Sequence, residues 1–93
     1  MTLFALQIDA TADGNEYAQG SRQHLLVFVR ADSEDAAFAE ALVALSDKRW
    51  TGAELKQISP FGVAPASIDD PSVREAALKA AEGHRAIVVF DQA

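Results

Sequence analysis

Two stretches of the chain, His24–Arg30 (HLLVFVR) and Arg85–Asp91 (RAIVVFD), are apolar on both faces when each is drawn as an extended strand. Side chains alternate between the two faces of a strand, so strands of this kind belong in a sheet that is covered on both sides. This requirement limits the fold more than any other feature, because 93 residues make one small domain with few elements to supply the cover.

Two further strands are predicted from alternation and turn signals. Thr2–Asp9 alternates along its whole length, and Ala53–Ser59 is a weaker strand that we expect at an edge, where Lys56 would discourage pairing with other chains. The connection Ala10–Gln23 is polar and contains the turn signals Asp-Gly-Asn and Gly-Ser. It is longer than a tight hairpin needs, so we expect it either to be mobile or to have a function.

Two helices are predicted from their caps and periodicity. The first begins in the run Asp32–Asp35, which supplies an N-cap and first-turn carboxylates, and it extends to about Lys48. The second begins at Asp70 and Pro71 and stops at Gly83. The predicted sheet-facing side of the first helix consists of Phe38, Ala41, Leu42 and Leu45, with Glu40 and Asp47 on the opposite side.

The order of elements is strand, strand, helix, strand, a short extended piece at Phe61–Ala64, helix, strand. From the second strand onward this order resembles the ferredoxin-like α/β plait, with an added N-terminal strand. The resemblance implies an α+β fold with a four- to five-stranded sheet and two helices, within the single domain over residues 1–93 that the length predicts. It implies no activity, because this fold carries many unrelated functions.

Two helices on one face of such a sheet would leave the other face open. That face would expose an apolar patch, either Leu26 with Phe28 or Ile87 with Val89, which soluble monomers avoid. The patch needs a cover, and the candidates are a second subunit, the Ala10–Gln23 connection, or one helix on each face. Among these we expect a homodimer that forms through the open sheet face.

Charge argues against two classes of partner. The chain has eight basic and fourteen acidic residues, a formal net charge of −6, and its basic residues form no stripe. Since nucleic acids and anionic membranes are bound by clustered lysine and arginine, we expect neither as a partner. A basic protein partner would fit the sign of the charge.

The absence of cysteine excludes disulfides, thiolate nucleophiles and cysteine-ligated zinc. The first ten residues, MTLFALQIDA, lack the basic start and apolar core of a signal peptide, and no apolar run approaches the ~20 residues that span a bilayer. We therefore expect a cytoplasmic protein.

No catalytic or cofactor motif is found in the sequence. There is no Gly-x-Ser-x-Gly and no glycine-rich phosphate loop, so no catalytic residue, metal ligand or cofactor is assigned. The carboxylates of Asp32–Asp35 would repel a phosphate at the strand-to-helix junction. His24 and His84 would lie near the same sheet edge if their strands were parallel neighbours, but the simpler interpretation is two surface residues at strand starts.

Five residues are candidates for ligand binding. A pocket formed by Tyr17, Arg49 and Trp50 is conceivable, because an aromatic residue in a polar loop needs a contact and the single tryptophan ends a helix. The two histidines, His24 and His84, complete the set.

Two functions from different classes follow. The first is a non-enzymatic interaction module, homodimeric, with an immunity- or antitoxin-like protein that blocks a basic partner as its specific version. The alternative is a small enzyme or ligand-binding protein of the dimeric ferredoxin-like type, with a pocket between sheet and helices and with His24, His84, Tyr17 and Arg30 as candidates. The absence of catalytic motifs favours the first.

Overall fold

The computed structural model of the chain describes residues 2–62 and 67–92. These residues form four strands and two helices, which are β1 (Thr2–Ala12), β2 (Arg22–Ala31), α1 (Glu34–Asp47), β3 (Trp50–Pro60), α2 (Pro71–Ala81) and β4 (Ala86–Gln92). Each predicted strand and helix is present. The first two strands are longer than predicted, so the connection between them shortens to residues 13–21.

The four strands form one antiparallel sheet in the order β3-β1-β2-β4. β1 and β2 are the central strands and pair as a hairpin from Thr2 opposite Ala31 to Thr11 opposite Arg22. β3 pairs with β1 and β4 pairs with β2, so these two strands are the edges. Ala53–Ser59 was predicted to be an edge strand, and this is confirmed.

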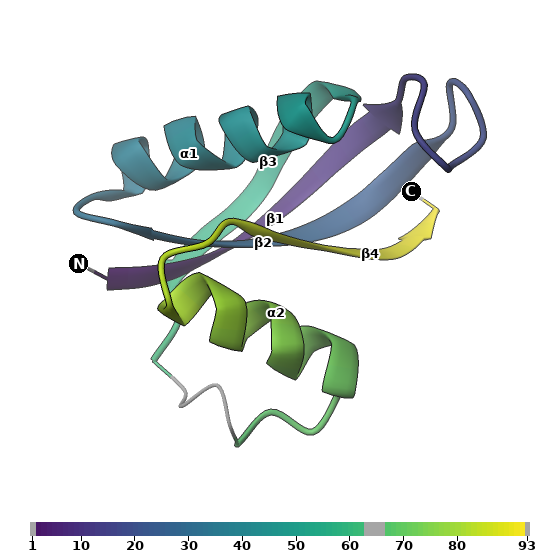
Figure 1. Cartoon of the computed structure of the whole chain (residues 1–93). Helices are drawn as coiled ribbons and strands as arrows, with labels where there is room; N and C mark the ends of the chain where they lie inside the picture. The colour runs from purple at the N-terminus through teal and green to yellow at the C-terminus, as the bar shows by residue number, and fades with distance from the viewer. Residues whose placement is uncertain (1, 63–66, 93) are drawn as a thin grey trace.

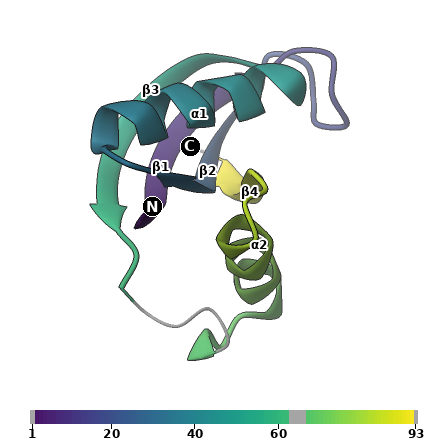
Figure 2. The same cartoon turned by 60° about the vertical axis from the view of Figure 1, so that its left-hand side comes forward.

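The two helices lie on opposite faces of this sheet, α1 above it and α2 below it in Figure 1. Seen after a 60° turn, α2 lies under β4, and β3 curves around α1 at the other edge (Figure 2). The cover that the two-faced strands require is therefore one helix on each face. The homodimer stays a prediction, but it no longer rests on an open apolar face.

The predicted α+β class, an antiparallel sheet with two helices, is confirmed. The strand order is not shown to be that of a ferredoxin-like plait. Here the N-terminal strand β1 lies between β2 and β3, the position that the Phe61–Ala64 piece would occupy in the plait. Phe61 and Gly62 are not part of a strand, and residues 63–64 lie outside the described residues.

β2 fills the core on both sides of the sheet, as its pattern predicts. Leu25, Val27 and Val29 belong to the cluster beneath α1. Phe28 belongs to the cluster above α2 and meets the ring of Phe61 edge-on, with centroids 5.1 Å apart. One strand thus supplies both layers of the core, and this fixes the helices to opposite faces.

The buried stripe of α1 differs from the predicted one. Its buried residues are Ala37, Ala41, Ala44 and Leu45. Leu42, predicted to face the sheet, is 39% exposed, and Phe38 is only partly buried. Alanines let the helix approach the sheet closely, so the stripe follows the small residues and rotates Leu42 toward solvent.

The ends of α2 match the sequence signals. The carboxylate of Asp70 accepts hydrogen bonds from the backbone N–H groups of Ser72 (2.9 Å) and Val73 (3.2 Å), and Pro71 is the first helical residue. Gly83 has a φ of +102°, the left-handed conformation that ends a helix and favours glycine. Between these ends the small side chains of Ala76, Ala77 and Ala80 pack on the sheet.

Candidate functional site

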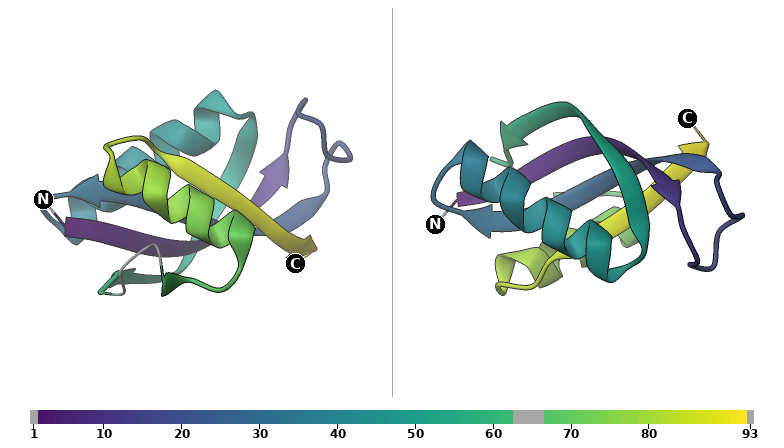
Figure 3. Two further views of the ribbon diagram at one scale, coloured as in Figure 1. Left: turned by 60° about the horizontal axis from the view of Figure 1, so that its bottom comes forward. Right: turned by 90° about the horizontal axis from the view of Figure 1, so that it is seen from above.

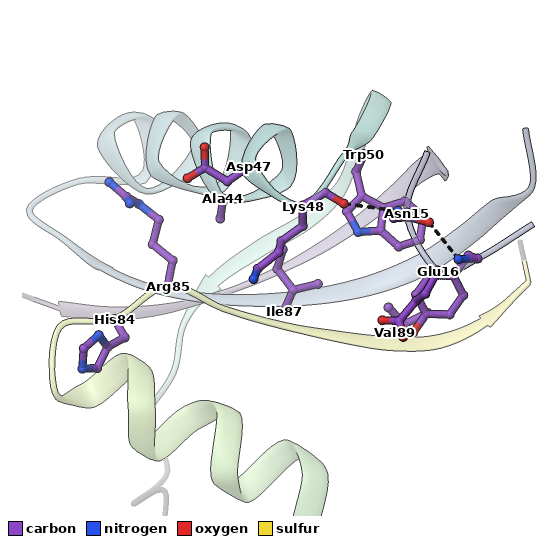
Figure 4. Close-up of a pocket in the computed structure, with 11 residues that line it drawn as sticks. Asn15, Glu16, Ala44, Asp47, Lys48, Trp50, His84, Arg85, Ile87 and Val89 are labelled. Atoms are coloured by element: carbon purple, nitrogen blue, oxygen red, sulfur yellow. Dashed lines mark hydrogen bonds between the residues drawn. The ribbon is translucent and has the colours of Figure 1, made fainter. Parts of the chain in front are cut away.

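A groove of about 530 Å³ runs between the C-terminal part of α1 and the strand β4 (Figure 4). Ile87 and Val89 of β4 form its apolar floor. Trp50 lies at one end, with Tyr17 packed against it, and Arg85 lies toward the other end (Figure 4). An apolar floor with polar groups around the rim is the usual make-up of a binding site.

The aromatic end of the groove is built by the 13–21 loop. The rings of Tyr17 and Trp50 are 5.3 Å apart between centroids and are tilted by 41°. Asn15 holds this contact, since its side-chain oxygen accepts from the Tyr17 N–H (2.9 Å) and its amide group donates to the carbonyls of Lys48 (3.3 Å) and Arg49 (3.1 Å). The 13–21 loop is thus hydrogen-bonded to the turn between α1 and β3. Its role in the fold is to hold that turn.

Arg49 does not line this groove. Its backbone has a φ of +60°, a left-handed conformation that is uncommon for a residue with a side chain. Its side chain extends over the loop, where a Cβ at Gly14 would lie 3.5 Å from the Arg49 Cδ atom. The structure gives Arg49 a place in the turn, beside the predicted pocket and not within it.

At the opposite end of the groove, Arg85 forms an ion pair with α1. The Arg85 Nε atom donates to the Glu40 carboxylate at 2.6 Å, joining the start of β4 to α1. The Glu40 side chain stays 43% exposed and does not line the groove, and it reaches Arg85 from the flank of α1. His84 precedes this pair, is exposed and lines the groove.

A second hollow, of about 540 Å³, lies directly along the outer edge of β4. Arg85 and the first four residues of β4, Ala86–Val89, line it, together with Glu75 and Lys79 of α2. Consecutive strand residues point to alternate faces, so a hollow lined by all four runs along the backbone of the strand. Within residues 2–62 and 67–92, no strand pairs with this edge.

His24 lies elsewhere, on the sheet face that carries α2. Its Nδ1 atom contacts the carboxylate of Asp9, which is directly opposite on β1 and is only 6% exposed. The second carboxylate oxygen of Asp9 lies 3.9 Å from the Lys56 Nζ atom. A third hollow, of about 490 Å³, adjoins this pair, and Leu26 and Phe90 line it.

A chain of charges extends from this pair along the sheet. Lys56 Nζ lies 2.9 Å from Glu54, and Glu54 lies 3.3 Å from an Nη atom of Arg22. The hydrogen bond and charge of Lys56 lower the pKa of Glu54, and Glu54 in turn raises the pKa of Lys56. Both side chains are about half exposed, so this pair adds little to stability.

The structure brings three of the five predicted ligand residues, Tyr17, Trp50 and His84, to one groove. His24 and His84 do not line a common hollow. Their strands are antiparallel, so the condition that would place both histidines near one edge is not met. Arg30, considered for the enzyme alternative, donates to the carbonyl of Ala81 at 3.0 Å and so caps the end of α2.

Sequence reasoning missed the Asp9–His24 contact, although a signal was present. The predicted strands ended at Asp9 and began at His24, and a regular hairpin pairs those two positions. The observed register does so. Lys56 and Glu54 join the pair only because β3 lies beside β1, which no local pattern shows.

Residues 2–62 and 67–92 contain no group of three or more His, Asp or Glu side chains placed to hold a metal ion. No helix among them combines the length and apolar character that crossing a bilayer requires. In comparisons with known proteins, no family model, curated protein or solved structure matches the chain.

Proposed function

We propose that this chain is a non-enzymatic protein-interaction module that binds an extended strand of its partner along the outer edge of β4. The observation that carries the proposal is the hollow along Arg85–Val89, which leaves space beside the strand backbone. An edge strand presents unpaired N–H and C=O groups, so an added strand gains main-chain hydrogen bonds there. The cytoplasmic location expected from the sequence belongs to the same proposal.

The two edges of the sheet differ in their protection. β3 carries Glu54 and Lys56, ends on Pro60, and has two register shifts against β1. These features discourage strand addition. β4 carries no charge and no proline between Ala86 and Phe90, and its one register shift against β2 falls at Phe90, so the run Ala86–Val89 has none of this protection.

The choice of bound strand would depend on its side chains, because those on its two faces meet different surfaces of this protein. Ile87 and Val89 face the groove with Tyr17 and Trp50. Val88 packs on the α2 side of the sheet. Alternate side chains of an added strand would therefore enter the groove on one face and lie against α2 on the other.

The groove also supports the basic partner that the net charge favours. Glu16 and Asp47 line it together with Lys48 and the Glu40-paired Arg85, and neither carboxylate forms an ion pair within the part of the chain that the structure describes. A lysine or arginine of the bound strand would reach these carboxylates and the face of Tyr17. An immunity- or antitoxin-like action, in which carboxylates cover a basic partner, is the specific form of this proposal.

A designed peptide tests the docking edge. An acetylated, amidated octapeptide of alternating lysine and valine places lysines on one face and valines on the other. Added to ¹⁵N-labelled protein, it should shift the amide resonances of β4 and leave those of β3 unchanged. An octapeptide of alternating glutamate and valine is the matched control and should bind more weakly. Shifts confined to β3, or none with either peptide, contradict the proposal.

One observation favours a second candidate function, a small enzyme. A carboxylate that contacts the Nδ1 atom of a histidine orients the ring for general-base chemistry, and the Asp9–His24 pair has this arrangement beside a hollow. No residue of either helix lines this hollow, so it does not fit the pocket between sheet and helices expected for the ferredoxin-like type. Hydrolysis of a panel of p-nitrophenyl esters, abolished in His24→Asn and Asp9→Asn, would establish this alternative.

A further inference from the structure

We propose that the strand that binds β4 is β4 of a second copy of this chain, paired antiparallel about Val88 in a twofold-symmetric dimer. This inference rests on the strand-binding part of the proposed function, and a basic partner would compete with the second copy for the same edge. It moves the homodimer expected from the sequence from a sheet face, which α2 occupies, to a sheet edge, which is open. The resulting dimer would have one continuous sheet of eight strands, four from each copy.

Symmetry fixes which residues face each other. A twofold axis perpendicular to the sheet keeps each side of the sheet on its own side, so a residue on the α1 side faces only α1-side residues of the copy. About Val88, Ile87 then faces Val89 of the copy, and both are on the α1 side. Phe90 lies at a register shift of β4 against β2, so the regular pairing covers Ile87, Val88 and Val89, and Phe90 of the copy comes next to Ala86 at the end of the run. Three apolar residues of one chain are thus opposed by three of the other.

This register also accounts for Phe90. Its side chain is 54% exposed, the most exposed large apolar side chain in the described part of the protein. In the dimer it lies next to Ala86, the smallest side chain of the run, so a large residue meets a small one. A register centred on Ile87 would instead place Phe90 opposite His84 and Val89 opposite the charged Arg85.

The surface beside β4 carries both signs of charge, as a self-complementary interface requires. Glu75 and Lys79 of α2 line the edge hollow and pair with each other at 3.4 Å. The twofold axis places the two α2 helices antiparallel on one side of the dimer, with their Glu75 and Lys79 side chains turned toward the new edge. Each lysine can then also approach the glutamate of the other copy. Figure 3 shows α2 and β4 side by side along this part of the molecule.

Cross-linking through single cysteines tests the pairing and its register. The chain has no cysteine of its own, so each variant carries one thiol. Residues paired across antiparallel strands have Cα atoms within the range that a disulfide spans. Val88→Cys should form a disulfide-linked dimer about ten-fold or more faster than Gln57→Cys, an exposed control on β3, because pairing raises the effective thiol concentration.

The register has its own readout. A mixture of Ile87→Cys and Val89→Cys proteins, both in the regular part of β4, should cross-link as the mixed pair more than as either pair with itself. Preferential self-cross-linking of Ile87→Cys would overturn the register. A rate for Val88→Cys equal to that for Gln57→Cys overturns the dimer at this edge. Light scattering on the wild-type protein measures association without any substitution. Its result therefore does not depend on whether a cysteine variant folds.

The outcomes also separate this inference from the proposed function. If Val88→Cys gives no preference but the lysine–valine peptide shifts the β4 amides, the edge binds strands and the second copy is not its partner. If neither effect is seen, both proposals fail.

Discussion

Tyr17, in the loop between β1 and β2, packs against Trp50 at the start of β3, with ring centroids 5.3 Å apart. Trp50 is only 5% exposed, so this contact joins the hairpin loop to the main core. The pair also forms the aromatic end of the groove beside β4. The loop therefore helps both the stability of the fold and the shape of the site.

Replacing Tyr17 with alanine should lower the free energy of unfolding by about 1–2 kcal/mol, because the aromatic contact and some apolar burial are lost. Urea unfolding followed by the fluorescence of Trp50, the single tryptophan, measures this directly. Tyr17→Phe keeps the ring and should unfold at nearly the wild-type urea concentration. An unchanged midpoint for Tyr17→Ala would mean that the ring contact contributes nothing.

Arg49→Gly should stabilise the protein. Arg49 has a φ of +60°, which costs a residue with a side chain about 1–2 kcal/mol, while glycine loses about 0.5–1 kcal/mol more backbone entropy on folding. The expected net gain is about 0.5 kcal/mol. Thermal unfolding measures it, and Arg49→Ala, which keeps the Cβ atom, should show no gain. A lower melting temperature for the glycine variant would contradict this assignment of strain.

Glu54 should titrate abnormally and return toward normal in Lys56→Gln. Lys56 and then Arg22 hold the pKa of Glu54 below its ordinary value of 4.5, so removing Lys56 should raise it. The pairing stabilises the folded protein at a pH above the ordinary pKa of Glu54. This stabilisation is lost as the pH falls through the lowered pKa of the folded state. NMR titration of the Glu54 side-chain carboxyl carbon measures the shift. Lys79→Gln, distant on α2, is the control and should leave the Glu54 pKa unchanged.

Association through β4 should strengthen with salt. Each copy has a formal charge of −6, whereas the run Ala86–Phe90 that pairs is uncharged. The long-range repulsion is screened as the Debye length falls from about 14 Å at 0.05 M to about 4 Å at 0.5 M salt. Analytical ultracentrifugation at these two salt concentrations should give a lower dissociation constant at the higher one. An interface held by ion pairs would respond in the opposite direction.

Local patterns predicted the strands and helices of this fold, but the order of the strands in the sheet depends on pairing between distant segments. The alternation of β2 predicted a sheet covered on both sides, and Asp70, Pro71 and Gly83 marked α2 closely. The strand order was not predictable in the same way, because nothing in Thr2–Asp9 says that it lies between two other strands. The assumption that both helices share a face came from the resemblance and not from the residues.

The same division holds for the site. Tyr17 and Trp50 were singled out for their residue types, and the structure brings them into contact. Arg49 was included as the neighbour of Trp50, but a residue in a tight turn points where the turn directs it. The edge hollow of β4 was not predicted, since an edge is defined only once the strand order is known.

The molar mass of the wild-type protein across a dilution series tests pairing at β4 most simply. The chain has a mass of 9.9 kDa. Light scattering on a sizing column should give a mass close to twice this value at high concentration, falling toward the single-chain mass on dilution. The Phe90→Lys variant places a charge at the exposed end of the pairing run and should shift the series toward the monomer. A mass of 9.9 kDa for the wild type at every concentration would contradict the dimer.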